Sequence, residues 1–322
     1  MNISQDFVKG MVDDGYDYML EKYDELEEVW PQLFEEKTIT GDFWQRTSLV
    51  SSGTWRKTGE TEGFQESNVI EGFTCYGRVF DYTDAHVFSN SAMKDIQKVK
   101  DLGKTFSADW GVSAKETREE FYARVFNKAG ITGGDWIFDP TPDSKAVAPT
   151  QTANLCYDSV CLVNLSNNTR SSKGGGTYYN GFAYDLLPDN LKTMKNYGMG
   201  TNNRRENDTR FKLSYDTLLV PQDLSDTAAE ILTSQLIAYN TTNTTNVLKG
   251  TLKPITWAYL DDTDAFFVLK AQMGLQALKR QEPVIDFFQD KKNRCWWYTA
   301  EQRIGHLAWN WRWILGSNCS TN

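Results

Sequence analysis

Few segments of the chain have residues whose types and spacing could carry chemistry. Asp101-Leu-Gly-Lys-Thr105 ends like a phosphate-binding loop, in which backbone N–H groups and a lysine hold phosphate oxygens. The first glycine of that motif would fall on Lys98, and helical apolar spacing continues on both sides, so we reject a phosphate site. Tyr197-Gly-Met-Gly200 lacks the third glycine of a dinucleotide-binding turn and follows a helical pattern, so we reject that site as well.

Metal-binding and acid–base residues give no stronger signal. His86 and His306 are the only histidines, and neither stands at ligand spacing from a cysteine or another histidine. Asp261, Asp262 and Asp264 could hold a hard cation, although a solvated turn explains the same cluster. No pattern indicates a Ser/His/Asp triad. We therefore expect that the chain is not an enzyme and has no catalytic, cofactor-binding or metal-binding residues.

Residues 90–129 have the longest helical pattern of the chain. Gly111 interrupts it, and Ser113 with Glu116 forms a capping box that would restart the helix. Two interpretations stay open: a two-helix hairpin broken at Gly111, or one long spine of about 55–60 Å across a flat subunit. Before the glycine, apolar side chains recur at steps of three and four and share one helix face: Met93, Ile96, Val99, Leu102, Phe106 and Trp110.

The composition predicts a large core that is rich in aromatic side chains. The chain has 322 residues, including 11 Trp, 15 Tyr and 17 Phe, and aromatic residues supply large buried areas in cores and interfaces. One or two domains are expected at this length. There is no run of about eighteen apolar residues, so we expect no membrane span. Five irregularly spaced cysteines and the lack of a signal peptide favour reduced thiols in a cytosolic setting.

The negative charge is concentrated at the N-terminus. Residues 1–36 hold eleven acidic and two basic side chains, a net of −9, which equals the net charge of the whole chain. The neutral remainder is therefore not a basic nucleic-acid binder. Residues 17–30 could form an acidic amphipathic helix, while Gly10 and Gly15 weaken the helix before it. With too few apolar residues for a core of its own, this segment is either an arm that docks on a partner or a solvated helix.

Residues 38–82 change to a strand pattern. Two strand-like runs flank a polar tip at Thr58–Gly63, and Trp55 lies just before that tip. A two-stranded hairpin alone is marginal in water. We therefore expect it to lie on a neighbouring subunit, with folding back onto its own sheet as the alternative.

The C-terminal half contains further strands and a capped helix. Asp216–Pro221 predicts a short buried strand, and Ser225 is a suitable N-cap for the helix that follows. Trp309, Trp311 and Trp313 alternate with polar residues, which predicts three tryptophans on one face of a strand.

The order of these elements supports a resemblance to a known family. The chain resembles a tailed-phage major capsid protein of the HK97 fold, of the Mu-like major head subunit type, from about Phe73 onward. No single segment is diagnostic of the family, and the resemblance depends on the order and spacing of several segments. The segments that match are Tyr76–Tyr82, Thr217–Pro221 with Ala228–Leu232, Asn246–Gly250 and Trp309–Gly316.

The resemblance implies an α+β fold with an N-terminal arm, an extended β-hairpin loop, a peripheral domain with a long spine helix, and an axial domain. The expected limits are 1–36 for the acidic arm, 37–80 for the extended loop, 81–213 for the peripheral domain with its spine at 90–129, 214–285 for the axial domain, and 286–322 for the closing strands of the peripheral domain.

The resemblance also implies a function. Subunits of this family form pentamers and hexamers that tile an icosahedral shell around double-stranded DNA. The expected role is a major capsid (head) protein of the virion, assembled in the host cytoplasm. The expected partners are other copies of the chain, a separate scaffolding protein, a portal, a possible decoration protein and DNA bound without sequence-specific contact, with no membrane. The acidic arm would then dock on a neighbouring subunit. Some relatives crosslink a Lys to an Asn; Lys57 lies near the loop tip, but no partner Asn can be matched.

Two alternatives stay open. The nearer one is the shell of a cellular nanocompartment with the same fold, which would hold an enzyme cargo and no DNA. The other is a Trp-rich carbohydrate-binding or carbohydrate-cleaving β-protein, because aromatic strand faces also stack on sugars. Cleavage would require paired carboxylates in a cleft, and such a protein would stay small in solution.

Overall fold

The computed structural model describes residues 5–50, 57–60, 63, 70–89, 91, 99–131, 156–158, 160–166, 169–236 and 245–319. Its helices are α1 (Gln5–Glu25), α2 (Trp30–Leu33), α4 (Val99–Asn127), α5 (Pro188–Gly200) and α6 (Ser225–Thr233), with short 3-10 turns at η2 (Gln222–Leu224) and η3 (Trp311–Trp313). Its strands are β1 (Glu35–Thr38), β2 (Phe43–Val50), β3 (Ile70–Ser89), β4 (Arg170–Ser171), β5 (Thr177–Tyr178), β6 (Gly181–Phe182), β7 (Thr217–Val220), β8 (Lys253–Thr256), β9 (Phe266–Leu269), β10 (Leu275–Asp290), β11 (Cys295–Ala308) and β12 (Ile314–Ser317).

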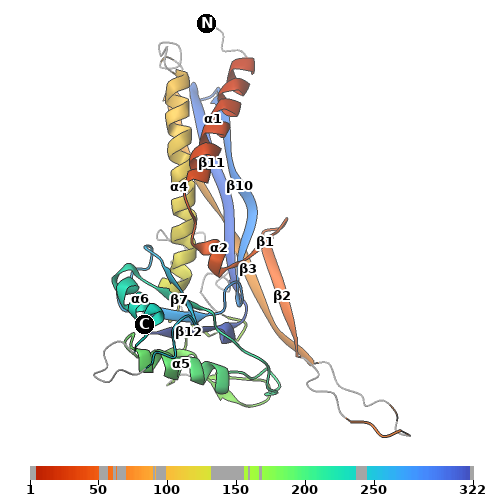
Figure 1. Ribbon diagram of the computed structural model, residues 1–322. Coiled ribbons are helices and arrows are strands. Elements are labelled where there is room, and N and C mark those ends of the chain that lie inside the picture. Colours follow the sequence, from red (N-terminus) through yellow and green to blue (C-terminus); the bar gives the residue numbers. More distant parts are fainter. Residues whose placement is uncertain are drawn as a thin grey trace.

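Two five-stranded sheets organise the described part of an elongated molecule (Figure 1). The long sheet has the order β1-β10-β11-β3-β2, and β3, β10 and β11 extend beside α4. The short sheet has the order β6-β12-β9-β7-β8 and lies at the other end with α5 and α6. The mixed α+β class expected from the sequence is confirmed.

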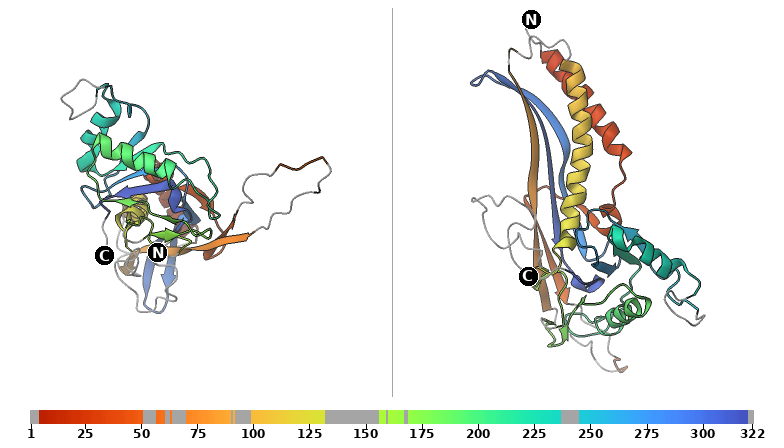
Figure 2. Two further views of the ribbon diagram at one scale, coloured as in Figure 1. Left: turned by 90° about the horizontal axis from the view of Figure 1, so that it is seen from below. Right: turned by 90° about the vertical axis from the view of Figure 1, so that its left-hand side faces the viewer.

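One face of the long sheet packs on the helices. Side chains alternate between the two faces of a strand, and Trp296 and Tyr298 of β11 join a buried cluster with Met19 of α1 and Trp110 of α4. Figure 2 shows both helices on this same side of the long strands. The intervening Trp297 therefore points to the opposite face, which we call the outer face of the long sheet.

The predicted spine is one continuous helix. α4 runs through Gly111 without a break, so the helical hairpin broken at this residue is wrong; residues 92–98 lie outside the described residues. A Cβ at Gly111 would stand 2.5 Å from the Met19 carbonyl oxygen of α1, so the glycine permits a close helix crossing. Ser113 is not an N-cap, because its carbonyl accepts a 2.7 Å hydrogen bond from Thr117 Oγ1 within the helix.

The acidic N-terminal segment packs on its own chain. α1 lies along α4, and Val12, Tyr16 and Met19 face the cluster that contains Tyr298. Gly15 permits this approach, since a Cβ there would be 2.8 Å from Ser107 Oγ of α4. Small residues thus let a few apolar side chains of this segment reach the core of its own subunit, and docking of the segment on a neighbouring subunit stays a prediction.

The end of the acidic segment belongs to the main core. Trp30, Leu33 and Phe34 are fully buried, and Trp30 packs on Tyr122 of α4 with ring centroids 4.6 Å apart. The next residues form β1, which pairs in parallel with β10. The last residues of this segment therefore pack in the core of their own subunit, and the limits 1–36 for the arm stay a prediction.

Glu119 of α4 joins three segments. Its Oε1 accepts hydrogen bonds from Val29 N at 2.5 Å and Trp30 N at 3.4 Å, and its Oε2 accepts one from Trp257 Nε1. Val29 supplies no side-chain cap for α2, so the Glu119 carboxylate satisfies N–H groups at the start of that helix. Trp257 directly follows β8 of the short sheet. One carboxylate, 6% exposed, thus links α2, the spine and the short sheet, and its burial raises the pKa of Glu119.

Arg118 ties the spine to the long sheet in a similar way. Its Nη2 pairs with Glu282 Oε2 of β10 at 2.5 Å, and its Nε donates to Gln302 Oε1 of β11 at 3.0 Å. Nη1 donates to the Tyr23 hydroxyl of α1. A buried guanidinium is tolerated here because acceptors on three other elements surround it.

The short sheet confirms the predicted buried strand before Pro221. All four residues of β7 are buried, and β7 pairs in parallel with β8 and antiparallel with β9. The predicted N-cap at Ser225 is wrong, because α6 begins at this residue and Leu224 precedes it without a side-chain cap. The turn η2 already brings Ser225 to helical dihedrals, φ −59° and ψ −47°.

The three alternating tryptophans do not share a strand face. Trp311 and Trp313 lie in the 3-10 turn η3, where the Asn310 side chain accepts a hydrogen bond from Arg312 N. A 3-10 turn rotates successive side chains by about 120°, which scatters them. Trp309, Trp311 and Trp313 accordingly pack in three different hydrophobic clusters. The predicted single Trp face is therefore wrong.

Strand pairing and core packing group four elements differently from the expected domain limits. β10 begins inside 214–285 but belongs to the long sheet, and β12 lies inside 286–322 but belongs to the short sheet. β6 and α5, from within 81–213, pack with the short sheet. The division into peripheral and axial domains stays a prediction.

Burial of His306 predicts that the folded protein loses stability at acidic pH. It packs edge-on to Phe121 with centroids 6.0 Å apart, and its burial lowers the pKa of His306 from 6.5 to about 3. The unfolded chain therefore binds an extra proton between these values, so stability present above pH 6.5 is lost as the pH falls toward 3. We expect protonation of His306 in the unfolded chain to lower the free energy of unfolding by about 2 kcal/mol between pH 7 and pH 5. Urea unfolding at several pH values should show a smaller loss in His306→Gln, and an equal loss in both proteins would contradict the assignment.

Candidate assembly surfaces

The hairpin of β2 and β3 projects from the body of the molecule (Figure 1). Two contacts hold the base of the hairpin, on the side that faces the body of the subunit. The Arg46 guanidinium of β2 stacks on the Trp309 ring at 3.7 Å from the centroid. Arg280 of β10 forms an ion pair with Asp42, just before β2. These contacts set the direction in which the hairpin leaves the subunit.

The other side of the hairpin exposes aromatic side chains. Phe43 is 60% exposed and Tyr76 is 49% exposed. The register pairs Phe43 with Arg78 and Tyr76 with Gln45, so both aromatic rings lie on one face. Lys57 and the described residues of the predicted tip, 58–60 and 63, are exposed. Trp55 lies outside the described residues, and a crosslinking role for Lys57 stays a prediction.

A row of apolar side chains crosses the outer face of the long sheet. Trp297 of β11 stands opposite Val87 of β3 and Phe288 of β10. Phe288 and Trp297 stack with centroids 6.4 Å apart and planes at 6°. Val87 is 51% exposed and Phe288 is 47% exposed. We call these three residues the outer row. Sequence reasoning missed it because the row exists only once the strand register is known; the single local signal is the alternation around Trp297.

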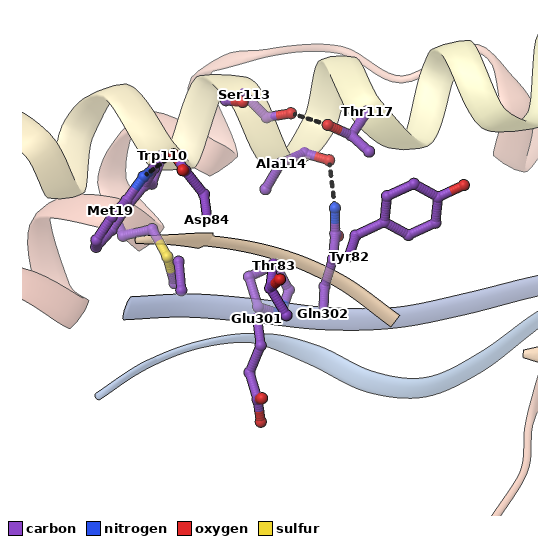
Figure 3. Close-up of a pocket in the computed structure, with 12 residues that line it drawn as sticks. Met19, Tyr82, Thr83, Asp84, Trp110, Ser113, Ala114, Thr117, Glu301 and Gln302 are labelled. Atoms are coloured by element: carbon purple, nitrogen blue, oxygen red, sulfur yellow. Dashed lines mark hydrogen bonds between the residues drawn. The ribbon is translucent and has the colours of Figure 1, made fainter. Parts of the chain in front are cut away.

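A groove of about 190 Å³ lies between α4 and the long sheet (Figure 3). Trp110 Nε1 donates to Asp84 Oδ2 at 2.7 Å on one side, and Gln302 Nε2 donates to the Ala114 carbonyl at 3.2 Å on the other. Figure 3 shows the Glu301 carboxylate directed away from α4. Among the described residues that line it, the groove therefore has no facing pair of carboxylates of the kind that glycoside cleavage requires.

The remaining polar clusters do not form a metal site within the part of the chain that the structure describes. No three His, Cys, Asp or Glu side chains gather there at metal-binding geometry. Asp264 N donates to Asp262 Oδ1 at 3.4 Å, and a hydrogen bond between the two carboxyl groups raises the pKa of Asp264. No described helix is long and apolar enough to cross a membrane. What the described surface offers instead is exposed apolar area on a projecting hairpin and an open sheet face.

Known proteins resemble this chain in structure but not in sequence. No family model and no curated protein matches the sequence. A subunit of the bacteriophage PhiM1 mature capsid aligns with 92% of this chain and 88% of its own length, at 8% identity and a TM-score of 0.52. The chain has the HK97-type fold of phage capsid proteins. The spine helix α4 and the extended β2–β3 hairpin expected from that fold are both present.

Two other solved structures are similar to this HK97-type chain. A virus-like particle from Pyrococcus furiosus covers 95% of this chain and 98% of its own, at 10% identity and a TM-score of 0.49. The capsid of cyanophage P-SCSP1u covers 92% and 89%, at 8% identity and a TM-score of 0.48. The Mu-like subtype stays a prediction.

Proposed function

We propose that this chain is a major capsid protein that self-assembles through pentamers and hexamers into an icosahedral shell around phage double-stranded DNA. The observation that carries the proposal is the extent of the fold likeness to the PhiM1 mature capsid subunit, which covers nearly all of both chains. A shell is closed by many repeated contacts between identical subunits. The whole subunit, and not one module of it, is therefore the relevant unit of comparison.

The exposed surfaces support a role in self-assembly. A two-stranded ribbon that carries two half-exposed aromatic rings is marginal in water unless another surface covers it. The outer row offers a second uncovered apolar area on the opposite face of the sheet from α1 and α4. Covering apolar area contributes about 25 cal/mol per Å², so many such contacts together favour a closed lattice.

The proposed partners follow from the shell function. They are other copies of the chain, a separate scaffolding protein, a portal and a possible decoration protein, with the protein located in the virion capsid after assembly in the host cytoplasm. The net charge of −9 favours DNA packaging without tight or sequence-specific contact between the shell wall and the DNA.

The test is electron microscopy of the chain expressed alone, after size-exclusion chromatography. We expect closed shells or ring-shaped capsomers. A monomer of 36.8 kDa that also fails to assemble on co-expression with candidate scaffolding proteins would contradict the proposal. Shells isolated from the native source that hold an enzyme cargo and never DNA would favour the nanocompartment alternative.

The exposed hairpin face should be required for assembly. In the double variant Phe43→Asp and Tyr76→Asp, we expect a folded subunit without shells, because both side chains are exposed in the free chain and would meet a neighbour only in the lattice. Phe43→Leu with Tyr76→Phe keeps the apolar surface and should still assemble. Particle yield by sedimentation and folding by circular dichroism separate the two effects. Normal yield from the aspartate variant would show that this face is not an interface.

A further inference from the structure

The turn between β10 and β11 is positively charged, whereas the side of α1 that faces away from α4 and the long sheet is negatively charged. We call this side of the helix the outer face of α1. We propose that the acidic outer face of α1 in one copy binds the basic β10–β11 tip and the outer row of a second copy. This proposal rests on the proposed function, because it assigns one specific contact of the assembled shell.

The β10–β11 tip, residues 290–294, presents cations to solvent. Asp290 is used to hold the turn: its Oδ1 accepts from Lys292 N at 2.9 Å, and its Oδ2 accepts from Asn293 Nδ2 at 2.6 Å. Lys291, Lys292 and Arg294 are exposed, and none of them forms an ion pair with another described residue. Three positive charges thus project from a turn whose single carboxylate is already engaged.

The tip and the outer row form one amphipathic surface. Phe288 precedes the tip by two residues in β10, and Trp297 follows it by three residues in β11. The stacked pair Phe288 and Trp297, extended by Val87, therefore lies directly beside the three cations. An apolar centre with a positive border suits a partner that offers an apolar side chain among carboxylates.

The outer face of α1 has this complementary pattern. Asp13, Asp17, Leu20 and Asp24 recur at steps of four, three and four, which places them on one helix face. All four are exposed, and Leu20 stands between carboxylates on both sides along the helix. The opposite stripe of α1 is the one that packs on α4 and the sheet. The exposed stripe therefore remains available to a neighbour.

Geometry requires that the two surfaces come from different copies. α1 lies on the inner face of the long sheet, where Gly15 meets Tyr298, whereas Trp297 points to the outer face. A helix on one face cannot cover side chains on the other face of the same sheet. Because the two contact surfaces differ, the contact is heterologous, and it extends into a ring or lattice.

Chemical crosslinking of the native protein tests the contact directly. Wild-type chains labelled with ¹⁴N and ¹⁵N are mixed before assembly, then treated with a carbodiimide, which joins carboxylates to lysine amines without a spacer. Mass spectrometry should find mixed-isotope peptides that join Lys291 or Lys292 to an acidic residue of α1. Mixed-isotope peptides that join these lysines only to other segments, or no crosslink at all, would overturn the proposal. A crosslink to a co-expressed scaffolding protein in place of α1 would also overturn it.

Charge reversal tests whether the contact contributes to assembly. We expect Lys291→Glu with Lys292→Glu to lower the association constant at least about tenfold at low salt. Adding Asp13→Lys and Asp17→Lys should restore it, because the charges are then exchanged between the two surfaces. Lys192→Glu with Lys249→Glu changes the net charge equally at exposed sites elsewhere and serves as the control. Normal assembly of the tip variant, or no recovery in the fourfold variant, would overturn the contact, whereas failure of the wild-type protein to assemble would instead count against the proposed function.

Discussion

Replacement of Glu119 by alanine should lower the free energy of unfolding by about 3–5 kcal/mol. The substitution leaves Trp257 Nε1 and the N–H groups at the start of α2 without their acceptor. Each buried polar group left without a partner costs about 1–3 kcal/mol, and α2 has no side-chain cap of its own to compensate. Denaturant unfolding followed by circular dichroism would measure the loss.

Two further variants show whether the effect comes from these hydrogen bonds. Glu119→Gln keeps one acceptor oxygen and should cost less than alanine. Glu120→Ala removes the neighbouring glutamate, whose side chain is 57% exposed, and should change stability by less than about 0.5 kcal/mol. Equal stability of the Glu119→Ala and Glu120→Ala proteins would show that the Glu119 junction does not hold α2 and the short sheet to the spine.

Gly111→Ala should destabilise the protein by about 2–3 kcal/mol, although alanine favours a helix by about 1 kcal/mol over glycine. The two effects have opposite signs, so the experiment distinguishes two explanations of this glycine. If Gly111 only weakened the helix, alanine would stabilise the protein. Because a Cβ would stand 2.5 Å from a backbone oxygen of α1, the helices must instead move apart.

A second helical glycine provides the matched control for Gly111. Gly200, in the last turn of α5, has nothing within 4 Å of an added Cβ, so Gly200→Ala should be neutral or stabilising. Thermal unfolding of both variants beside the wild-type protein tests the pair. A Gly111→Ala protein as stable as Gly200→Ala would contradict the close crossing of α1 and α4.

Local patterns in the sequence were sufficient for the main elements. The apolar spacing up to Trp110 predicted the spine, because a helix places every third or fourth residue on one face whatever its partner is. The run Thr217–Val220 predicted a buried strand in the same way, since all four residues are apolar or β-branched and a proline follows them. The order of these elements along the chain was enough to support the capsid fold.

Tertiary structure decided the points on which local rules conflict with long-range contacts. Gly111 looks like a helix break in the sequence, but it is a crossing point, because only the position of α1 shows why a Cβ is excluded there. Trp309, Trp311 and Trp313 look like one strand face, but a hydrogen bond from Arg312 N to the Asn310 side chain turns the chain and sends the three rings into different clusters.

The surfaces proposed for assembly show the same division between sequence and structure. The acidic composition of residues 1–36 is evident from the sequence, but which acidic residues remain exposed depends on how α1 packs against α4. The outer row depends on strand register, since Val87, Phe288 and Trp297 are far apart in sequence and become neighbours only through the pairing of β3, β10 and β11. Composition and periodicity are local properties that the sequence determined by itself. Register, helix crossing and the exposed sides of elements depend on contacts between distant residues, so only the tertiary structure decided them.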